Sequence, residues 1–255
     1  MNDDRDLAAN LQRLLSGDDR PPLERERLAT LMTLFATLPP PPDPCGLWPR
    51  FVPLRARFLA TTAADDPEAC EESFLELYCH VHGHEAPYTG AERARMDEVG
   101  GYWCHAGGLS PVLKAGEHIG PDTVSADYGA GNGLQGLLLQ KLYPHARTLQ
   151  IELSSRMVEA GRVLQDWLGI PEERVEWIVG DVLDHPPRGL DFVYLYRPVR
   201  PEGGGRRFYE MFAAELAAAP VGTVVFSIAD CLGSFVGDAC EIFYADGHLS
   251  CFRRR

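Results

Sequence analysis

The sequence predicts an α/β fold: a doubly wound, mostly parallel sheet with a C-terminal antiparallel hairpin, preceded by an N-terminal helical cap. Three observations predict it. Short apolar runs alternate with amphipathic segments from about residue 122 onward, a glycine-rich turn at 127–136 follows the first run, and Asp246-Gly247 separates the last two runs. We place a helical domain at 1–107 and an α/β domain at 108–255.

Composition restricts the possible functions. The chain has 255 residues, of which 45% are hydrophobic, so it can bury a sizeable core. Its formal net charge is −13, which argues against a broad surface for nucleic-acid phosphates. Four arginines close in sequence leave room for a local basic patch: Arg197, Arg200, Arg206 and Arg207.

The start of the chain is acidic and lacks the long apolar run of a signal peptide, and no segment approaches the length of a membrane span. Seven cysteines are scattered without a C-x-x-C pair, which suits reduced thiols. We therefore expect a cytoplasmic protein without a membrane partner.

The first hundred residues are predicted to be helical. Segment 21–38 opens with prolines suited to a helix start and spaces its apolar residues by three and four, and Pro39–Pro42 then end it. Segments 50–62 and 66–82 repeat the pattern less regularly. We see no strand alternation and no fixed-period repeat here, and short helices of this kind need a surface to pack on.

The second part alternates between strands and helices, as expected for a parallel sheet. The predicted strands are 123–129, 147–153, 174–181, 190–198 and 222–230, the helices are 134–144, 154–169 and 205–220, and the hairpin is 239–254.

The glycine turn "DYGAGNGLQG" fits two nucleotide-binding signatures. From Gly131 it matches the dinucleotide pattern G-x-G-x-x-G, whereas from Asp127 it reads acidic-x-Gly129-x-Gly131-x-Gly133. An acid just before the glycines would repel a pyrophosphate at the helix N-terminus, but it suits the ammonium group of S-adenosylmethionine (SAM). We therefore favour SAM and expect Gly136 to ease packing within the helix.

Two further acids follow predicted strands. Glu152 ends the second strand, nineteen residues past Gly133, where a carboxylate can hold two ribose hydroxyls. Asp181 ends the third strand, where it can accept a hydrogen bond from the adenine amino group while Val182 packs on the ring. The ribose acid does not separate the two cofactors, because dinucleotide enzymes also use one.

With these features the chain resembles the class I SAM-dependent methyltransferases over roughly residues 108–255. The resemblance rests on the segments "DYGAGNG", "IELSSRMVEAGR", "VGDV" and "DFVYLY". It implies a seven-stranded sheet with SAM over the carboxyl ends of the first strands. Carried over by position, the glycine loop would cradle the methionine part, and the acids after the second and third strands would bind ribose and adenine. The loop residues concerned are Asp127, Gly129, Gly131 and Gly133.

The chain departs from that family pattern in three places. Only 183–189 is available for the helix between the third and fourth strands, and only 231–238 for the one between the fifth and sixth. The position five residues past Asp191 often begins an Asn-Pro-Pro-Tyr box in amide and base N-methyltransferases, but here 196–199 reads Tyr-Arg-Pro-Val. This disfavours amide and base N-methylation.

Tyr196 and Arg197 are the candidate acceptor-site residues, since the end of the fourth strand lies beside the crevice where parallel sheets hold ligands. A tyrosine can orient an acceptor by a hydrogen bond or line the methyl path with its ring. An arginine can grip a carboxylate or phosphate with two parallel bonds. The alternatives are that Arg197 points to solvent and that Tyr196 is structural, like its neighbour Tyr194.

The run "CHVHGHE" places His80, His82 and His84 at alternate positions before Glu85. On a strand these histidines could bind a metal. Because Cys79 ends a predicted helix and a glycine interrupts the run, we expect a solvated helix end and no metal.

The segment 100–111 places Tyr102, Trp103 and His105 between glycine pairs just before the nucleoside domain. This composition suits a lid whose aromatic residues contact ligand, and the alternative is a linker with buried aromatics.

The sequence thus predicts a SAM-dependent methyltransferase. A small-molecule acceptor is favoured over a protein or an RNA, because a cap beside an acidic sheet domain favours a closed pocket. Two other classes stay open: a non-catalytic SAM-binding or scaffold protein, and a nicotinamide-dependent oxidoreductase.

Overall fold

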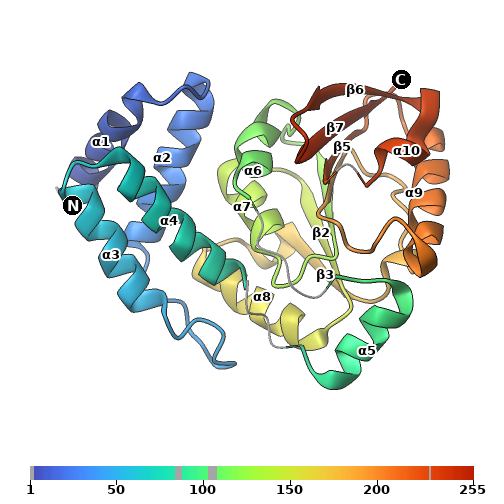
Figure 1. The fold of residues 1–255 in the computed structure, drawn as a ribbon, viewed down its shortest axis with the longest axis horizontal. Coiled ribbons are helices and arrows are strands. Elements are labelled where there is room, and N and C mark those ends of the chain that lie inside the picture. Colours follow the sequence, from blue (N-terminus) through green and yellow to red (C-terminus); the bar gives the residue numbers. More distant parts are fainter. Residues whose placement is uncertain (1–2, 84–87, 103–107, 230) are drawn as a thin grey trace. The chain divides into compact units, whose positions relative to one another are not determined.

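A computed structural model of the chain describes residues 3–83, 88–102, 108–229 and 231–255 (Figure 1). The chain divides into two compact units, Met1–Glu85 and Ala86–Arg255. This division precedes the predicted boundary at residue 107, because helix α5 (Gly90–Val99) belongs to the second unit. The predicted lid residues Trp103 and His105, together with His84 and Glu85, lie outside the described residues.

The first unit is helical, as predicted. Its elements are α1 (Asp3–Leu14), η1 (Leu15–Gly17), α2 (Pro22–Thr37), α3 (Phe51–Ala63) and α4 (Pro67–His82). In helix α4, local sequence signals explain where the helix begins and ends. The side chain of Asp66 accepts a hydrogen bond from the Ala69 amide, and Gly83 ends the helix at a φ of 87°.

Aromatic side chains fill the interior of the first unit. The rings of Phe35 and Phe74 meet edge to face, with centroids 5.6 Å apart, and Phe58 lies 5.5 Å from Phe74 on the other side. All three side chains are fully buried. Such pairs add to the stabilisation that burial of their area already provides.

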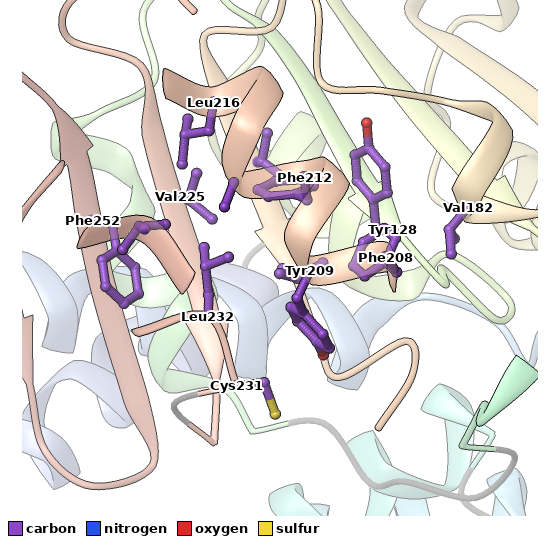
Figure 2. Close-up of a cluster of buried hydrophobic side chains, with 14 of the residues drawn as sticks. Tyr128, Val182, Phe208, Tyr209, Phe212, Leu216, Val225, Cys231, Leu232 and Phe252 are labelled. Carbon is purple, nitrogen blue, oxygen red and sulfur yellow. The ribbon is translucent and has the colours of Figure 1, made fainter. Parts of the chain in front are cut away.

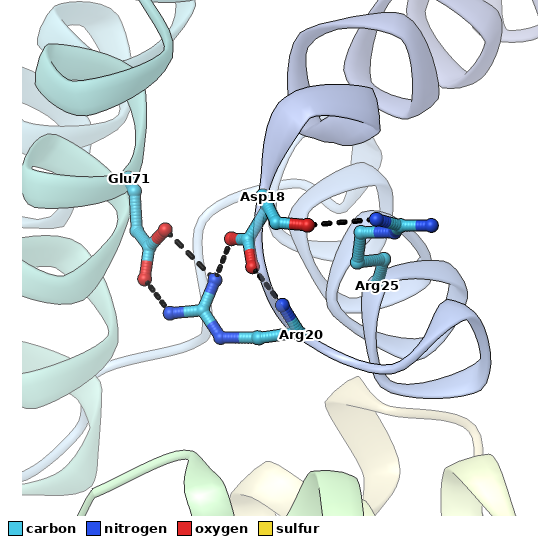
Figure 3. A network of polar contacts seen from close by, with 4 residues as sticks. All are labelled: Asp18, Arg20, Arg25 and Glu71. Carbon is cyan, nitrogen blue, oxygen red and sulfur yellow. Dashed lines mark hydrogen bonds and ion pairs between the residues drawn. The ribbon is translucent and has the colours of Figure 1, made fainter.

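A polar network fixes the turn between α1 and α2 to α4 (Figure 3). The Arg20 guanidinium forms ion pairs with Asp18 in the turn and with Glu71 in α4, and Arg25 donates to the Asp18 carbonyl at 2.7 Å. The pairs are partly shielded from water, and Arg20 engages Glu71 through both terminal nitrogens.

The second unit contains a seven-stranded sheet in the order β3-β2-β1-β4-β5-β7-β6. Strands β1 to β5 are parallel, and β7 pairs antiparallel with both β5 and β6, so the predicted fold class is confirmed. The strands are β1 (Val124–Tyr128), β2 (Arg147–Glu152), β3 (Val175–Val179), β4 (Phe192–Leu195), β5 (Val224–Ile228), β6 (Cys240–Ala245) and β7 (Leu249–Arg254).

Helices lie on both faces of this sheet (Figure 1). They are α6 (Ser110–Lys114), α7 (Leu134–Leu142), α8 (Ser155–Trp167), α9 (Arg206–Ala218) and α10 (Gly233–Val236). The two trimmed connections predicted from the sequence are present: β3 leads to β4 through one 3-10 turn, η4 (Val182–Asp184), and α10 is four residues long.

Residues alternate between the two faces of each strand. Tyr128 in β1 points toward α9, where its ring meets Phe212 edge to face at 5.5 Å (Figure 2). Ala126, two residues before Tyr128, joins the same buried cluster. Asp127 lies between them and points to the opposite face of the sheet. The carboxylate at the end of β1 therefore faces the side covered by α7 and α8.

The C-terminal hairpin forms at the predicted Asp246-Gly247 turn. One carboxylate oxygen of Asp246 accepts hydrogen bonds from the amides of His248 (2.9 Å) and Leu249 (2.8 Å), and Gly247 takes a φ of 84°. Strand β7 lies between β5 and β6, and its first four residues are buried there, including the polar side chain of Ser250.

Candidate functional site

The candidate site lies where the parallel strands β1 to β4 end. Because these neighbouring strands run in the same direction, their carboxyl ends meet at one edge of the sheet, which is where open α/β sheets bind ligands. The predicted cofactor residues lie at or just after the carboxyl ends of β1, β2 and β3, and the predicted acceptor residues follow β4. The topology therefore brings both sets to the same edge.

The loop after β1 is a run of left-handed glycines. Gly129, Gly131 and Gly133 have φ angles of 74°, 58° and 68°, a region that other L-residues enter only at a cost. A Cβ on Gly129 would lie 2.8 Å from Pro198, whereas one on Gly131 would meet nothing within 4 Å. The loop thus packs on the protein at Gly129 and has open space at Gly131.

Glu152 ends β2 and holds the glycine loop. Its Oε2 accepts a hydrogen bond from the Gly131 amide at 2.8 Å, and its Oε1 accepts one from the Ser154 amide at 2.9 Å. The side chain is buried, and this burial raises its pKa to about 7 against the opposing effect of the amide donors. A buried carboxylate beside an open glycine loop is suited to accept further hydrogen bonds from ligand hydroxyls.

Asp127 lies one residue before the end of β1, beside Gln150 of β2 and Tyr194 of β4. It is buried, and burial raises its pKa to about 7, while a hydrogen bond from the Gly136 backbone acts in the opposite direction. Glu152 adds to the increase through like charge. A cationic ligand group beside these two carboxyl groups would favour their ionised forms.

Gly136 has a packing role, but against Gln150 of β2 rather than within the helix as predicted. Gly136 lies in the first turn of α7, and a Cβ there would overlap the side chain of Gln150, with its Cδ at 3.0 Å. Gln150 in turn donates to the Gly133 carbonyl at 3.0 Å. Gly136 therefore makes room for a side chain that supports the glycine loop.

Asp181 and Val182 follow β3. The Asp181 carboxylate caps the 3-10 turn η4 by accepting from the Leu183 amide at 3.0 Å, and its Oδ2 lies 3.9 Å from Nη2 of Arg95. Val182 is buried within the cluster on the α9 face (Figure 2). The adenine roles of both residues stay predictions, as do the cofactor roles of the other loop residues.

Tyr196 and Arg197 lie outside β4, which ends at Leu195 rather than running to Pro198 as predicted. The strand ends early because Arg197 has a φ of 46°, a left-handed conformation in a residue that carries a side chain. Tyr196 is half-buried and stacks on Tyr194, with ring centroids 6.0 Å apart. Strained backbone of this kind concentrates at functional sites.

The Arg197 side chain is held over the edge of the sheet and does not extend freely into solvent. Its Nη2 donates to the Tyr102 hydroxyl at 2.6 Å, and its guanidinium carbon lies 4.5 Å from the centre of that ring. Its Nε is buried and has no hydrogen-bond partner among the described residues. Arg197 therefore retains a buried N–H that could donate a hydrogen bond to a ligand oxygen.

Sequence reasoning missed several residues at this edge. Ala229 follows β5 with a φ of 60°, a second strained residue that carries a side chain beside the end of β4. Glu92 in α5 accepts a hydrogen bond from Ser154, and Arg95 approaches Asp181. No local pattern marks Glu92 or Arg95, because both meet their partners only through the fold.

Of the histidine run, the structure describes His80 and His82. His80 is buried, contrary to the predicted solvated helix end, because it faces the start of α3 and its Nε2 accepts from the Arg50 amide at 3.1 Å. His82 lies 5.9 Å from the ring of Tyr78. Among the described residues no group of three histidine, cysteine or acidic side chains could hold a metal ion.

Two of the four arginines that left room for a local basic patch have contacts with other side chains. Arg206 pairs with Glu210 at 2.7 Å, and Arg200 lies over the Tyr102 ring at 5.4 Å.

Within the described residues, no helix is both long and apolar enough to cross a membrane.

Comparison with known proteins gives the following. No family profile and no curated protein matches the sequence. Among solved structures, TrmN from Thermus thermophilus is 16% identical with a TM-score of 0.49, and the match covers 58% of this chain and 48% of TrmN. An RNA methyltransferase from Salinibacter ruber in complex with S-adenosyl-L-homocysteine is 19% identical (TM-score 0.44, 57% of this chain and 88% of that one). A precorrin-6y C5,15-methyltransferase from Geobacter metallireducens is 16% identical (TM-score 0.40, 54% and 81%). This chain therefore spans about half of TrmN and most of the other two.

Proposed function

We propose that the chain is a SAM-dependent methyltransferase whose cofactor lies over the carboxyl ends of β1, β2 and β3. The observation that carries the proposal is the pairing of Glu152 with Gly131. The amide of Gly131, in the glycine loop after β1, donates a hydrogen bond of 2.8 Å to Glu152, the proposed ribose-binding acid at the end of β2. Asp127, Glu152 and Asp181 lie at the carboxyl ends of three adjacent strands, an arrangement that suits the ammonium, ribose and adenine groups of SAM.

The acid before the loop also favours SAM over a dinucleotide. Asp127 is buried on the face covered by α7, and its pKa is raised because burial disfavours its charge. A pyrophosphate at the start of α7 would add negative charge beside it, whereas the sulfonium and ammonium groups of SAM would stabilise the ionised carboxylate. A nicotinamide-dependent oxidoreductase is therefore disfavoured.

Methyl transfer places few demands on the protein. The sulfonium already activates the methyl group, so positioning of donor and acceptor in line supplies much of the catalysis. In the proposed site, Glu152 and Asp181 bind and orient the nucleoside, the glycine loop excludes side chains from the methionine part, and Tyr196 with Arg197 lines the acceptor side. Arg197 suits an acceptor that carries a carboxylate or phosphate, because its buried Nε–H can donate to such an oxygen.

The finer part of the proposal is a small-molecule acceptor. It rests on the net charge of −13, which disfavours a broad surface that tracks a phosphate backbone. The matched solved structures include an RNA methyltransferase.

Transfer of a labelled methyl group from SAM to a size-fractionated cell extract tests the proposal. We expect label in the fraction of small metabolites, and we expect the label to require active protein. Label in RNA or protein would retain the methyltransferase and replace the acceptor class. Binding of S-adenosylhomocysteine without transfer to any fraction would support a non-catalytic SAM-binding protein, and binding of NADH without SAM would overturn the proposal.

A further inference from the structure

The segment 89–102, which contains α5, contacts three loops at the carboxyl edge although it precedes every strand of the sheet. Its first turn reaches the loop after β2, and its middle faces the loop after β3. Its end pairs with the loop after β4 through an antiparallel bridge between Gly101 and Val199. One short segment thus joins the loops that carry the predicted cofactor and acceptor residues (Figure 1).

Glu92 is the residue through which α5 meets the cofactor side. Its Oε2 closes the capping box of the helix by accepting from the Thr89 amide at 2.7 Å and from the Thr89 hydroxyl at 2.8 Å. Its Oε1 accepts a short hydrogen bond from the Ser154 hydroxyl. One oxygen of the carboxylate therefore serves the helix, and the other binds the loop after β2.

The contact continues from Ser154 to the proposed ribose-binding acid. The Ser154 amide donates to Oε1 of Glu152 at 2.9 Å, and Oε2 of Glu152 accepts from the Gly131 amide at 2.8 Å. The Ser154 hydroxyl also caps α8 by accepting from the Met157 amide at 3.3 Å. A continuous set of hydrogen bonds thus runs from α5 to the glycine loop.

We propose that Glu92 is a positioning residue for Glu152 and acts through Ser154, so that α5 forms part of the cofactor site. This inference rests on the proposed function. Buried acceptors bind a ligand well when their own rotamers are fixed by neighbouring hydrogen bonds, and Glu92 supplies the outermost of these. The pair of Arg95 with Asp181, at 3.9 Å, is a second contact between the same helix and a predicted cofactor carboxylate.

Calorimetric binding of S-adenosylhomocysteine to the full chain tests the proposal. Glu92→Ala should weaken binding roughly tenfold, because it frees the hydroxyl that holds the β2 loop. Glu92→Gln keeps the capping geometry with a neutral acceptor and should give an intermediate loss. The matched control is Thr89→Val, which breaks the cap of α5 but leaves Glu92 beside Ser154 and should change affinity by less than about twofold.

A double-mutant cycle with Ser154→Ala separates positioning from general damage to the fold. If Glu92 acts through Ser154, the double variant should bind no more weakly than Ser154→Ala alone. Independent losses that add, equal losses in Glu92→Ala and Thr89→Val, or wild-type affinity in Glu92→Ala would each overturn the proposal. Failure of the wild-type chain to bind S-adenosylhomocysteine would instead refute the proposed function itself, and thermal unfolding without ligand confirms that each variant is folded.

Discussion

Trp177 in β3 lies directly against Gly133 of the glycine loop. A Cβ on Gly133 would be 2.9 Å from Cζ3 of the indole and closer still to its Cη2. Gly161 in α8 borders the same ring, and the indole nitrogen donates to Gln165 at 2.8 Å. The indole therefore fills the space between the loop and α8, and only glycine fits at the loop position beside it.

Gly133→Ala should consequently destabilise the fold by about 2–5 kcal/mol, because it combines a left-handed backbone with overlap against a fixed ring. Gly169→Ala is the matched control: its φ is 64°, close to the 68° of Gly133, but nothing lies within 4 Å of the added Cβ. It should cost only about 1–2 kcal/mol. Urea unfolding of both variants measures the difference, and equal losses would mean that the contact with Trp177 is unimportant.

Glu152→Ala should weaken S-adenosylhomocysteine binding by on the order of 1.5–3 kcal/mol, because hydrogen bonds to a charged acceptor are lost in a buried site. Glu159→Ala on the exposed face of α8 provides a control that removes the same charge. Calorimetry at fixed pH measures both variants. Wild-type affinity in Glu152→Ala would show that the ribose lies elsewhere.

The fold and the position of the candidate site residues at the carboxyl edge could be predicted from the sequence because their signals are local. Strand alternation, the Asp246-Gly247 turn and the glycine loop each occupy a few consecutive residues, and each appears where it was expected. Topology then places the ends of neighbouring parallel strands together without any knowledge of side-chain contacts.

The contacts that the sequence did not predict join distant segments. Glu92 and Ser154 are 62 residues apart, and Tyr102 and Arg197 are 95 apart. Neither pair has a periodic or spacing signal, because the fold alone brings the pre-sheet segment back across the edge. The end of β4 was misplaced for a different reason: its apolar pattern continues to Tyr196, but the left-handed turn at Arg197 interrupts the strand.

Asp127 should make the unliganded protein less stable as the pH rises, whereas a carboxylate with a lowered pKa makes a protein more stable. Burial raises the pKa of Asp127 to about 7 from 3.8, so between these values the folded state holds a proton that the unfolded chain has lost. Its contribution to stability is therefore fully present below about pH 4 and is lost as the pH rises through about 7. Relative to wild type, Asp127→Asn should gain stability between pH 5 and pH 8, by on the order of 2–4 kcal/mol.

Urea unfolding of both proteins at several pH values measures this difference, and a constant difference across the range would contradict it. The same ionisation links to the cofactor. Because a cationic ligand favours the ionised carboxylate, affinity for S-adenosylhomocysteine should increase from pH 6 to pH 8 in the wild type and change less in Asp127→Asn.

Substitutions of the proposed acceptor-site residues should slow methyl transfer without weakening cofactor binding. Arg197→Ala removes the guanidinium held by Tyr102, and Tyr196→Phe removes the hydroxyl of a half-buried tyrosine next to it in sequence. Both variants should bind S-adenosylhomocysteine nearly as the wild type does, because neither residue belongs to the loops after β1, β2 or β3. Both should slow methyl transfer to the labelled fraction at least tenfold, which corresponds to roughly 1.4 kcal/mol of activation free energy.

Arg188→Ala is the appropriate control for Arg197, since Arg188 is an exposed arginine whose guanidinium pairs with Glu215 on the surface. It should leave transfer unchanged. Tyr102→Phe distinguishes how Arg197 is held: it removes the 2.6 Å hydrogen bond but keeps the ring 4.5 Å from the guanidinium carbon. A partial loss of rate with unchanged cofactor affinity is expected. A structure with bound S-adenosylhomocysteine in which both Tyr196 and Arg197 lie more than about 10 Å from the sulfur would refute the acceptor assignment, because positioned groups act at roughly 3 Å.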